Sequence, residues 1–253
     1  MATYKEIHGV KVQYRDSDAP STIGDVWYNS TTGLLKMYAS VGAWASGGNL
    51  NTAATARSTA GSQTANIAFG GNTPPSTANA ETYDGSSWTE VADLNTARRE
   101  MTGTGISTAA LGAGGLHTEE IGNTEIWDGS SWTEVADLNT NRTLGAGLGT
   151  TTAAIVAGGD SNNPGSGGSV DNAESWNGTS WTEVADLNTD RQNLWGVGIS
   201  TAGIVFAGSN PPSRGETETW DGSSWTEVGD LNTVRYGNSG SGGPAGPSAA
   251  LCI

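Results

Sequence analysis

The chain has 253 residues, 38 of them glycine, and only 15% are charged, a composition that favours turns and closely packed strands over amphipathic helices. Its formal net charge of −15 opposes binding to the phosphate backbone of nucleic acids. The one cysteine, Cys252, has no partner for an internal disulfide, so packing must stabilise the fold.

Residues 1–33 are predicted to form an N-terminal extension, a candidate attachment segment. The first residues, MATYKEIHGV, lack the apolar run of a signal peptide, and no apolar stretch is long enough to span a bilayer. We therefore expect a protein made in the cytoplasm of its host, without membrane insertion. Within this region VWYN (residues 26–29) either joins the repeats that follow or forms a hairpin beside them.

Residues 34–253 contain about five copies of one unit, marked by a tryptophan that recurs about every 44 residues, with one interval of 49. The strongest copies are ETYDGSSWTEVADLNTAR, EIWDGSSWTEVADLNTNR, ESWNGTSWTEVADLNTDR and ETWDGSSWTEVGDLNTVR, and AWASGGNLNTAA is a weaker first copy. A unit of this length is typical of a four-stranded propeller blade. The repeated tryptophans are Trp44, Trp88, Trp132, Trp181 and Trp225.

Each unit predicts four antiparallel strands. A Gly/Ala-rich pair such as TGTGIST and AALGAGG comes first, and strands around TEIWDG and SWTEVADL follow. DGSS or NGTS joins the last two as a hairpin turn, because Asp-Gly and Asn-Gly tolerate positive φ. Small residues suit inner strands that converge on an axis. One sheet leaves both of its faces uncovered, so neighbouring sheets must stack and the ring must close.

The two ends of the repeat region are complementary. The last copy stops after its inner strands, and the first lacks a complete inner pair. We therefore predict that SAALCI at the C-terminus and LLKMYASVGAWAS near the N-terminus share one composite blade. The predicted fold is all-β, a five-bladed β-propeller of four-stranded antiparallel blades closed by this composite blade.

Within each unit an arginine, a Gly-Gly doublet after an apolar strand, a Glu-x-aromatic strand and a tryptophan follow one another. This pattern resembles kelch repeats, which implies a propeller but no single function. In the first copy Ala54 stands where the arginine is expected, and in the fourth Ala207-Gly208 replaces the doublet. The doublets are Gly70-Gly71, Gly114-Gly115 and Gly158-Gly159.

A second pattern lies nearer the start, where GDVWYNSTTGLLKMY is followed by VGAW. It resembles a segment of structural proteins of tailed bacteriophages, particularly fibre and virion-decorating proteins of marine phages. This resemblance covers about 20 residues and implies a virion protein with other virion proteins as partners. The alternative interpretation is an ordinary strand-turn-strand around Asn-Ser-Thr-Thr-Gly.

The sequence predicts no catalytic site, metal site or cofactor. His8, His117 and Cys252 are too few to assemble the copper site of kelch-like oxidases. DGSSW departs from the Asp-box of sialidases because its Asp and Gly are adjacent. A recurring set of acidic residues, better explained as solvated strand ends than as a Ca²⁺ ring, comprises Asp93, Asp137, Asp186 and Asp230.

A repeated glutamate precedes each turn, but catalytic carboxylates need two different environments, which symmetric copies do not provide. We expect these glutamates to meet the repeated arginines, or backbone amides, as ties between blades. The glutamates are Glu81, Glu125, Glu174 and Glu218, and the arginines are Arg98, Arg142, Arg191 and Arg235.

Variation between copies is concentrated in the loop between the second and third strands and in the residues after the arginine. Because packing requires sameness, variable loops on a rigid scaffold indicate a recognition face. The alternative is that these loops merely drift. The candidate ligand-binding residues are Asn72, His117, Asn162, Asn163, Trp195, Arg214 and Tyr236.

We therefore expect a non-enzymatic phage structural or adsorption protein, a fibre or capsid-decoration component of the virion, that binds a host-surface glycan or protein. The alternative is a soluble five-bladed lectin with one sugar site per blade. A lectin of that kind predicts similar loops in every copy, whereas these loops differ. The sequence leaves the ligand, the oligomeric state, the position on the virion and the host undefined.

Overall fold

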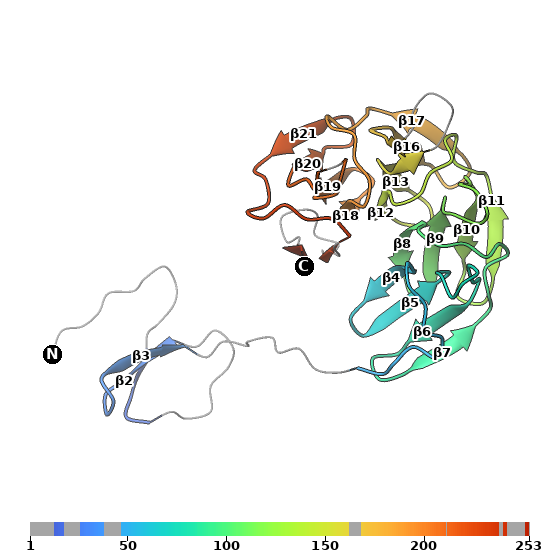
Figure 1. The fold of residues 1–253 in the computed structure, drawn as a ribbon. Helices are drawn as coiled ribbons and strands as arrows, with labels where there is room; N and C mark the ends of the chain where they lie inside the picture. Colours follow the sequence, from blue (N-terminus) through green and yellow to red (C-terminus); the bar gives the residue numbers. More distant parts are fainter. Residues whose placement is uncertain are drawn as a thin grey trace. The chain divides into compact units, whose positions relative to one another are not determined.

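The computed structural model describes residues 13–17, 26–37, 47–161, 168–210, 212–237, 240–241 and 251–252. The chain divides into two compact units, residues 1–46 and 47–253, where the sequence placed a boundary after residue 33. Every regular element among the described residues is a β-strand, and the strands of the second unit form several sheets (Figure 1). The all-β class predicted from the composition is confirmed.

The first unit contains a three-stranded sheet. β1 (Gln13–Arg15) runs parallel to β2 (Val26–Asn29), and β3 (Leu34–Met37) runs antiparallel to β2. Asn29 shapes the turn, because its Oδ1 accepts hydrogen bonds from the backbone N–H groups of Thr31 (3.0 Å) and Thr32 (2.9 Å). Val26–Asn29 therefore forms a hairpin with Leu34–Met37.

The second unit contains four antiparallel sheets, each of four strands, which follow one another along the chain. Sheet I comprises β4 (Ser58–Ser62), β5 (Ala65–Phe69), β6 (Ala80–Tyr83) and β7 (Trp88–Val91). Sheet II comprises β8 (Thr102–Ile106), β9 (Ala109–Ala113), β10 (Thr124–Trp127) and β11 (Trp132–Val135).

Sheets III and IV repeat this order. Sheet III comprises β12 (Ala146–Gly149), β13 (Ala154–Ala157), β16 (Ala173–Trp176) and β17 (Trp181–Val184). Its loop between second and third strands holds a small hairpin of β14 (Asp160–Ser161) and β15 (Gly168–Ser169). Sheet IV comprises β18 (Trp195–Ile199), β19 (Ala202–Phe206), β20 (Thr217–Trp220) and β21 (Trp225–Val228).

The four sheets lie in an arc, with β4, β8, β12 and β18 along its inner side and the fourth strands along its outer side (Figure 1). Small residues let the inner strands approach. A Cβ on Gly147 would lie 2.6 Å from Thr102 Cγ2 of the neighbouring sheet. Thr102 Oγ1 also donates a hydrogen bond to the carbonyl of Gly145 (3.0 Å). This arrangement is consistent with propeller-like blades.

The Gly-Gly doublets allow a similar approach at the end of each second strand. Gly114 adopts a φ of 68°, and a Cβ there would lie 2.4 Å from the carbonyl oxygen of Arg142. The next residue, Gly115, donates its N–H to that same carbonyl (2.9 Å). The doublet therefore anchors the segment that enters the following sheet, which requires residues without a side chain.

The repeated tryptophans fill the spaces between sheets. Trp132 packs on Phe69 of sheet I with ring centroids 4.8 Å apart, and Trp181 donates from Nε1 to Thr124 Oγ1 of sheet II (3.1 Å). Trp132, Trp181 and Trp225 are each 6% exposed. Trp88 is only half-buried, because sheet I is the first of the four and its leading face carries no described sheet.

A two-stranded hairpin follows sheet IV. β22 (Gly240–Ser241) pairs antiparallel with β23 (Leu251–Cys252), and β22 contacts the inner strand β18. The described chain after sheet IV thus contains a further pair of strands. Trp44 and the rest of the segment 38–46 lie outside the described residues.

Candidate functional site

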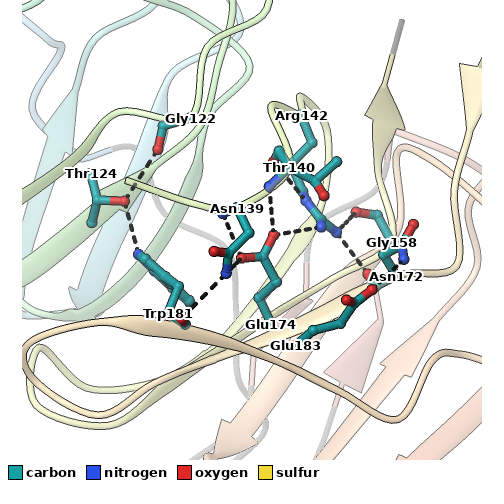
Figure 2. Close-up of polar contacts among 10 residues, drawn as sticks. All are labelled: Gly122, Thr124, Asn139, Thr140, Arg142, Gly158, Asn172, Glu174, Trp181 and Glu183. Carbon is teal, nitrogen blue, oxygen red and sulfur yellow. Dashed lines mark hydrogen bonds and ion pairs between the residues drawn. The ribbon is translucent and has the colours of Figure 1, made fainter. Parts of the chain in front are cut away.

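A buried glutamate on the third strand of each sheet is held by the segment that enters that sheet. In sheet III the Glu174 carboxylate accepts hydrogen bonds from the Asn139 backbone N–H (2.7 Å), Asn139 Nδ2 (2.8 Å) and the Thr140 N–H (3.1 Å). Arg142 Nη2 completes the set at 2.8 Å (Figure 2). We call this arrangement the carboxylate clasp.

The clasp ties consecutive sheets together, because Asn139 follows the last strand of sheet II whereas Glu174 belongs to sheet III. Sheets II and IV repeat it with Arg98–Glu125 (2.6 Å) and Arg191–Glu218 (2.8 Å). The ion pairs predicted for Arg98, Arg142 and Arg191 are therefore present. Burial lowers the pKa of the Arg142 guanidinium, but the charge of Glu174 counteracts this, and arginine stays protonated.

The first copy builds its clasp differently. The sequence has Ala54 at the arginine position, but Arg57 three residues later donates from Nη1 to Glu81 (3.1 Å). Burial alone would raise the pKa of Glu81, yet hydrogen bonds from the Asn51 and Thr52 N–H groups, with the charge of Arg57, hold this pKa below its ordinary value. The tie is thus kept by a residue at a different position.

The tie expected for Arg235 is not found among the described residues. Arg235 is exposed, and its Nε donates to the carbonyl of Thr233 at 3.4 Å instead of to a glutamate. The physical reason is that the clasp glutamate always lies on the third strand of the following sheet. Only the hairpin β22–β23 follows sheet IV in the described chain.

The DGSS segments form the predicted hairpin turns. In sheet II the Asp128 carboxylate accepts from the Ser130 Oγ (2.7 Å), the Ser130 N–H (2.8 Å) and the Ser131 N–H (2.9 Å). These hydrogen bonds, led by the one from the Ser130 side chain, lower the pKa of Asp128 to about 2. Asn177 makes the same contacts in sheet III, so the turn requires an acceptor and not a charge.

The repeated acidic residues at strand ends are all exposed, as expected of solvated positions: Asp93, Asp137, Asp186 and Asp230.

The variable segments meet at one end of the sheets, opposite these turns. Isolated bridges join each entering segment to the loop between second and third strands of the same sheet: Thr55 to Asn72, Arg99 to Leu116, Thr143 to Asp160 and Gln192 to Ser209. We call this end of the second unit the loop face.

Five of the predicted ligand-binding residues can be placed on or beside the loop face. Asn72 is half-buried and lines an open hollow of about 740 Å³ with Pro74. His117 is exposed, and its Nδ1 donates to the carbonyl of Ala97 (2.8 Å). Tyr236 is 62% exposed.

The other two have partners within the fold. Arg214 forms an ion pair with Glu216 (3.2 Å), which partly neutralises the charge of the arginine. Trp195 is half-buried and stands opposite Phe206 in the register of β18 and β19. Asn162 and Asn163, also predicted to bind ligand, lie outside the described residues.

A cavity of about 70 Å³, which the sequence did not reveal, lies between the inner strands. Arg57, Thr59, Thr102, Gly147 and Trp195 are among its lining residues, so all four sheets contribute. Sequence comparison marks Trp195 as unique to its copy. It does not show that Arg57, unique to another copy, lines the same space.

A relay of main-chain hydrogen bonds runs beside this cavity from one entering segment to the next. Glu100 donates to the carbonyl of Ala56 (3.1 Å), Leu144 to that of Glu100 (2.9 Å) and Asn193 to that of Leu144 (3.0 Å). These four residues have positive φ values of 53–58°, which is uncommon for residues other than glycine. Gly237 is a fifth member, because it has a φ of 61° and donates to the carbonyl of Asn193 (3.4 Å).

The described residues contain no group of three or more His, Cys, Asp or Glu side chains suited to hold a metal ion. Among the same residues no helix is long and apolar enough to cross a membrane. The sequence matches no protein-family model and no curated protein. Any function is therefore inferred from the chain itself.

Proposed function

We propose that this chain is a non-enzymatic structural or adsorption protein of a tailed bacteriophage, whose loop face binds a glycan or a protein on the host surface. The observation that carries the binding role is the separation of constant from variable positions. Constant residues such as Glu174 and Trp181 are buried between sheets, whereas the variable residues His117 and Tyr236 are exposed at the loop face or beside it. The virion assignment rests on the N-terminal pattern GDVWYNSTTGLLKMY.

We further propose that the sheets are blades of a five-bladed propeller resembling kelch proteins. Two observations support this proposal: Gly237 continues the main-chain relay beyond sheet IV, and β22 contacts the inner strand β18. Apolar residues that a following blade would cover are exposed on sheet IV and directly after it: Val228 on β21 is 39% exposed, and Val234 is 59% exposed. In a closed ring the relay would end with a hydrogen bond from Ala56 N–H to the carbonyl of Gly237.

The outer half of that fifth blade would come from the N-terminal region. Among the described strands, β3 and β23 each pair on one side only, so each has an edge that a further strand could extend. Leu34 and Leu35 on β3 are 57% and 67% exposed, which provides apolar surface for packing. Closure through these strands would remove the open edges and join the two ends of the chain without a covalent bond.

Mass spectrometry of purified virions tests the assignment. The proposal predicts peptides of this chain in particles banded by density, at a constant ratio to the major capsid protein. Their absence from such particles, with the chain present in the lysate of the infected host, would overturn the virion role.

Binding to an array of bacterial surface glycans tests the recognition role. We expect one or a few binding sites per chain, because the loops of the four sheets differ; the hairpin β14–β15, for example, occurs in sheet III only among the described loops. One equivalent site for each sheet would instead support the alternative of a five-bladed lectin.

A further inference from the structure

The cavity between the inner strands contains one cationic side chain among its lining residues, Arg57. The position of Arg57 in its repeat explains why this arginine lines the cavity. Arg98, Arg142 and Arg191 occupy the usual arginine position of the repeat. Arg57 instead lies directly before β4, at the position of Met101 in sheet II and Gly145 in sheet III. The first copy therefore keeps its ion pair with a guanidinium that also borders the central cavity.

This guanidinium has unused hydrogen-bonding capacity. The Arg57 side chain is 5% exposed, and only its Nη1 meets Glu81. Its Nε and Nη2 are buried, and neither donates a hydrogen bond within the described chain. By contrast, the guanidinium of Arg142 also donates to the carbonyls of Gly158 (3.1 Å) and Asn172 (2.7 Å). Buried donors without acceptors are unfavourable, and an acceptor that reaches them would relieve this cost.

One other lining residue of the cavity is aromatic. Trp195 occupies the position held by Ser58, Thr102 and Ala146 in the other sheets, so sheet IV alone has an aromatic residue there. It lines the cavity and also packs against Val197 and Phe206. Thr59 adds an exposed hydroxyl. Two residues that are each unique to one copy, Arg57 and Trp195, thus converge on one small space.

We propose that this cavity binds the carboxylate group of a small acidic ligand, such as an acidic sugar, with Arg57 as the anion-binding residue and Trp195 in contact with the rest of the ligand. Arginine suits this role because its planar array of donors matches the geometry of a carboxylate. A space of about 70 Å³ admits a few water-sized groups, so the ligand would enter by its small anionic end.

The net charge of −15 does not preclude an anion here. Charges separated by more than about 8 Å are largely screened at physiological ionic strength, so distant acidic residues oppose an anion only weakly. Glu81 already balances the charge of Arg57, so the ligand would be held by the hydrogen-bond donors Nε and Nη2. The proposal rests on the binding role proposed above and names the chemistry of the group bound. If the glycan found on the array is neutral and its binding is insensitive to Arg57, this site is wrong and the binding role stands.

The test is calorimetric titration of the intact chain with acetate, glucuronate and glucose. Acetate carries the carboxylate alone, glucose the ring alone and glucuronate both. We expect both carboxylates to bind, glucuronate more tightly, and glucose at least about tenfold more weakly than glucuronate. Failure of both carboxylates to bind, or equal binding of glucose and glucuronate, would overturn the proposal.

Variants locate the site. Arg57→Met uses the residue that sheet II has at this position, Met101, and should weaken both carboxylates at least about tenfold. The matched control is Arg98→Met, which removes a clasp arginine that does not line the cavity and should lower stability without changing affinity. Unchanged affinity in folded Arg57→Met would refute the assignment.

A milder variant keeps the test decisive if Arg57→Met does not fold. Trp195→Ser introduces the residue that sheet I has at this position, Ser58, and leaves Arg57 in place. It should weaken glucuronate, which contacts the indole through its ring, and leave acetate unchanged. Equal effects on both ligands, or no effect on glucuronate, would contradict the proposal.

Discussion

Removal of the Glu174 carboxylate is the sharpest perturbation of the ties between sheets. Glu174 and Arg142 both have side chains 1% exposed, and the carboxylate accepts four hydrogen bonds at 2.7–3.1 Å. Glu174→Ala leaves a buried guanidinium without its counter-charge and the donors of Asn139 and Thr140 without acceptors. Breaking a buried pair in this way costs about 3–5 kcal/mol.

Thermal unfolding followed by circular dichroism measures this effect. For a chain of this size each kcal/mol lowers the melting temperature by roughly 2–4 °C, so Glu174→Ala should melt roughly 10 °C below the wild type. The matched control is Glu183→Gln on the neighbouring strand, whose exposed carboxylate meets Asn172 Nδ2 (2.9 Å). That change should alter stability by less than about 0.5 kcal/mol.

A double-mutant cycle separates the ion pair from simple loss of packing. Because Arg142→Met together with Glu174→Ala removes both buried charges, the double variant should lose less stability than the two single variants lose in total. Equal melting of Glu174→Ala and the Glu183→Gln control would refute the clasp as a tie. Strict additivity in the cycle would show that the two side chains act independently.

Three further predictions concern other constant positions. The pKa of Asp128 is about 2 in the folded protein against an ordinary 3.8, so its contribution to stability is present above about pH 4 and is lost as the pH falls towards 2. In urea denaturation, Asp128→Asn should therefore lose less stability than the wild type between pH 4 and pH 2. An equal loss of stability in both proteins would contradict the assigned shift. Gly147→Ala should cost about 1–3 kcal/mol of stability because the new Cβ would meet the neighbouring sheet. The control Gly229→Ala, whose Cβ would have no atom within 4 Å, should be nearly neutral in the same assay. Equal effects of the two substitutions would refute the close approach. Trp132→Ala should cost about 3–5 kcal/mol of stability in thermal unfolding. If the ring of blades is closed as proposed, Trp88→Ala should cost a similar amount. A clearly smaller cost for Trp88→Ala would count against a closed ring.

The repeat made much of the second unit predictable from sequence. The spacing of Trp132 and its equivalents predicted successive four-stranded units, and Asp-Gly in the turns predicted the hairpins, because both depend on local chemistry. The pairing of Glu174 with Arg142 was also expected, because both residues recur from copy to copy and symmetric copies argue against a catalytic role for the glutamates.

Features that depend on the path of the chain in space were not predictable. Arg57 replaces the missing clasp arginine from three residues away, and alignment of the copies records only Ala54 at the aligned position. The central cavity was likewise not predictable from the sequence, because its walls come from four separate sheets. Trp195 was identified as a candidate because it differs from its equivalents, but the sequence does not show that it lines the same cavity as Arg57.

Recognition at the loop face requires that its residues be free to bind while the constant positions hold the sheets together. The most direct measurement is the affinity of the intact chain for its best array glycan, with melting temperature recorded for each variant. Tyr236→Ala and His117→Ala on the loop-face side should weaken binding without lowering the melting temperature, and Ser130→Ala in a turn at the opposite end should leave affinity unchanged. Undiminished binding in both loop-face variants, or equal loss in the turn variant, would contradict the account.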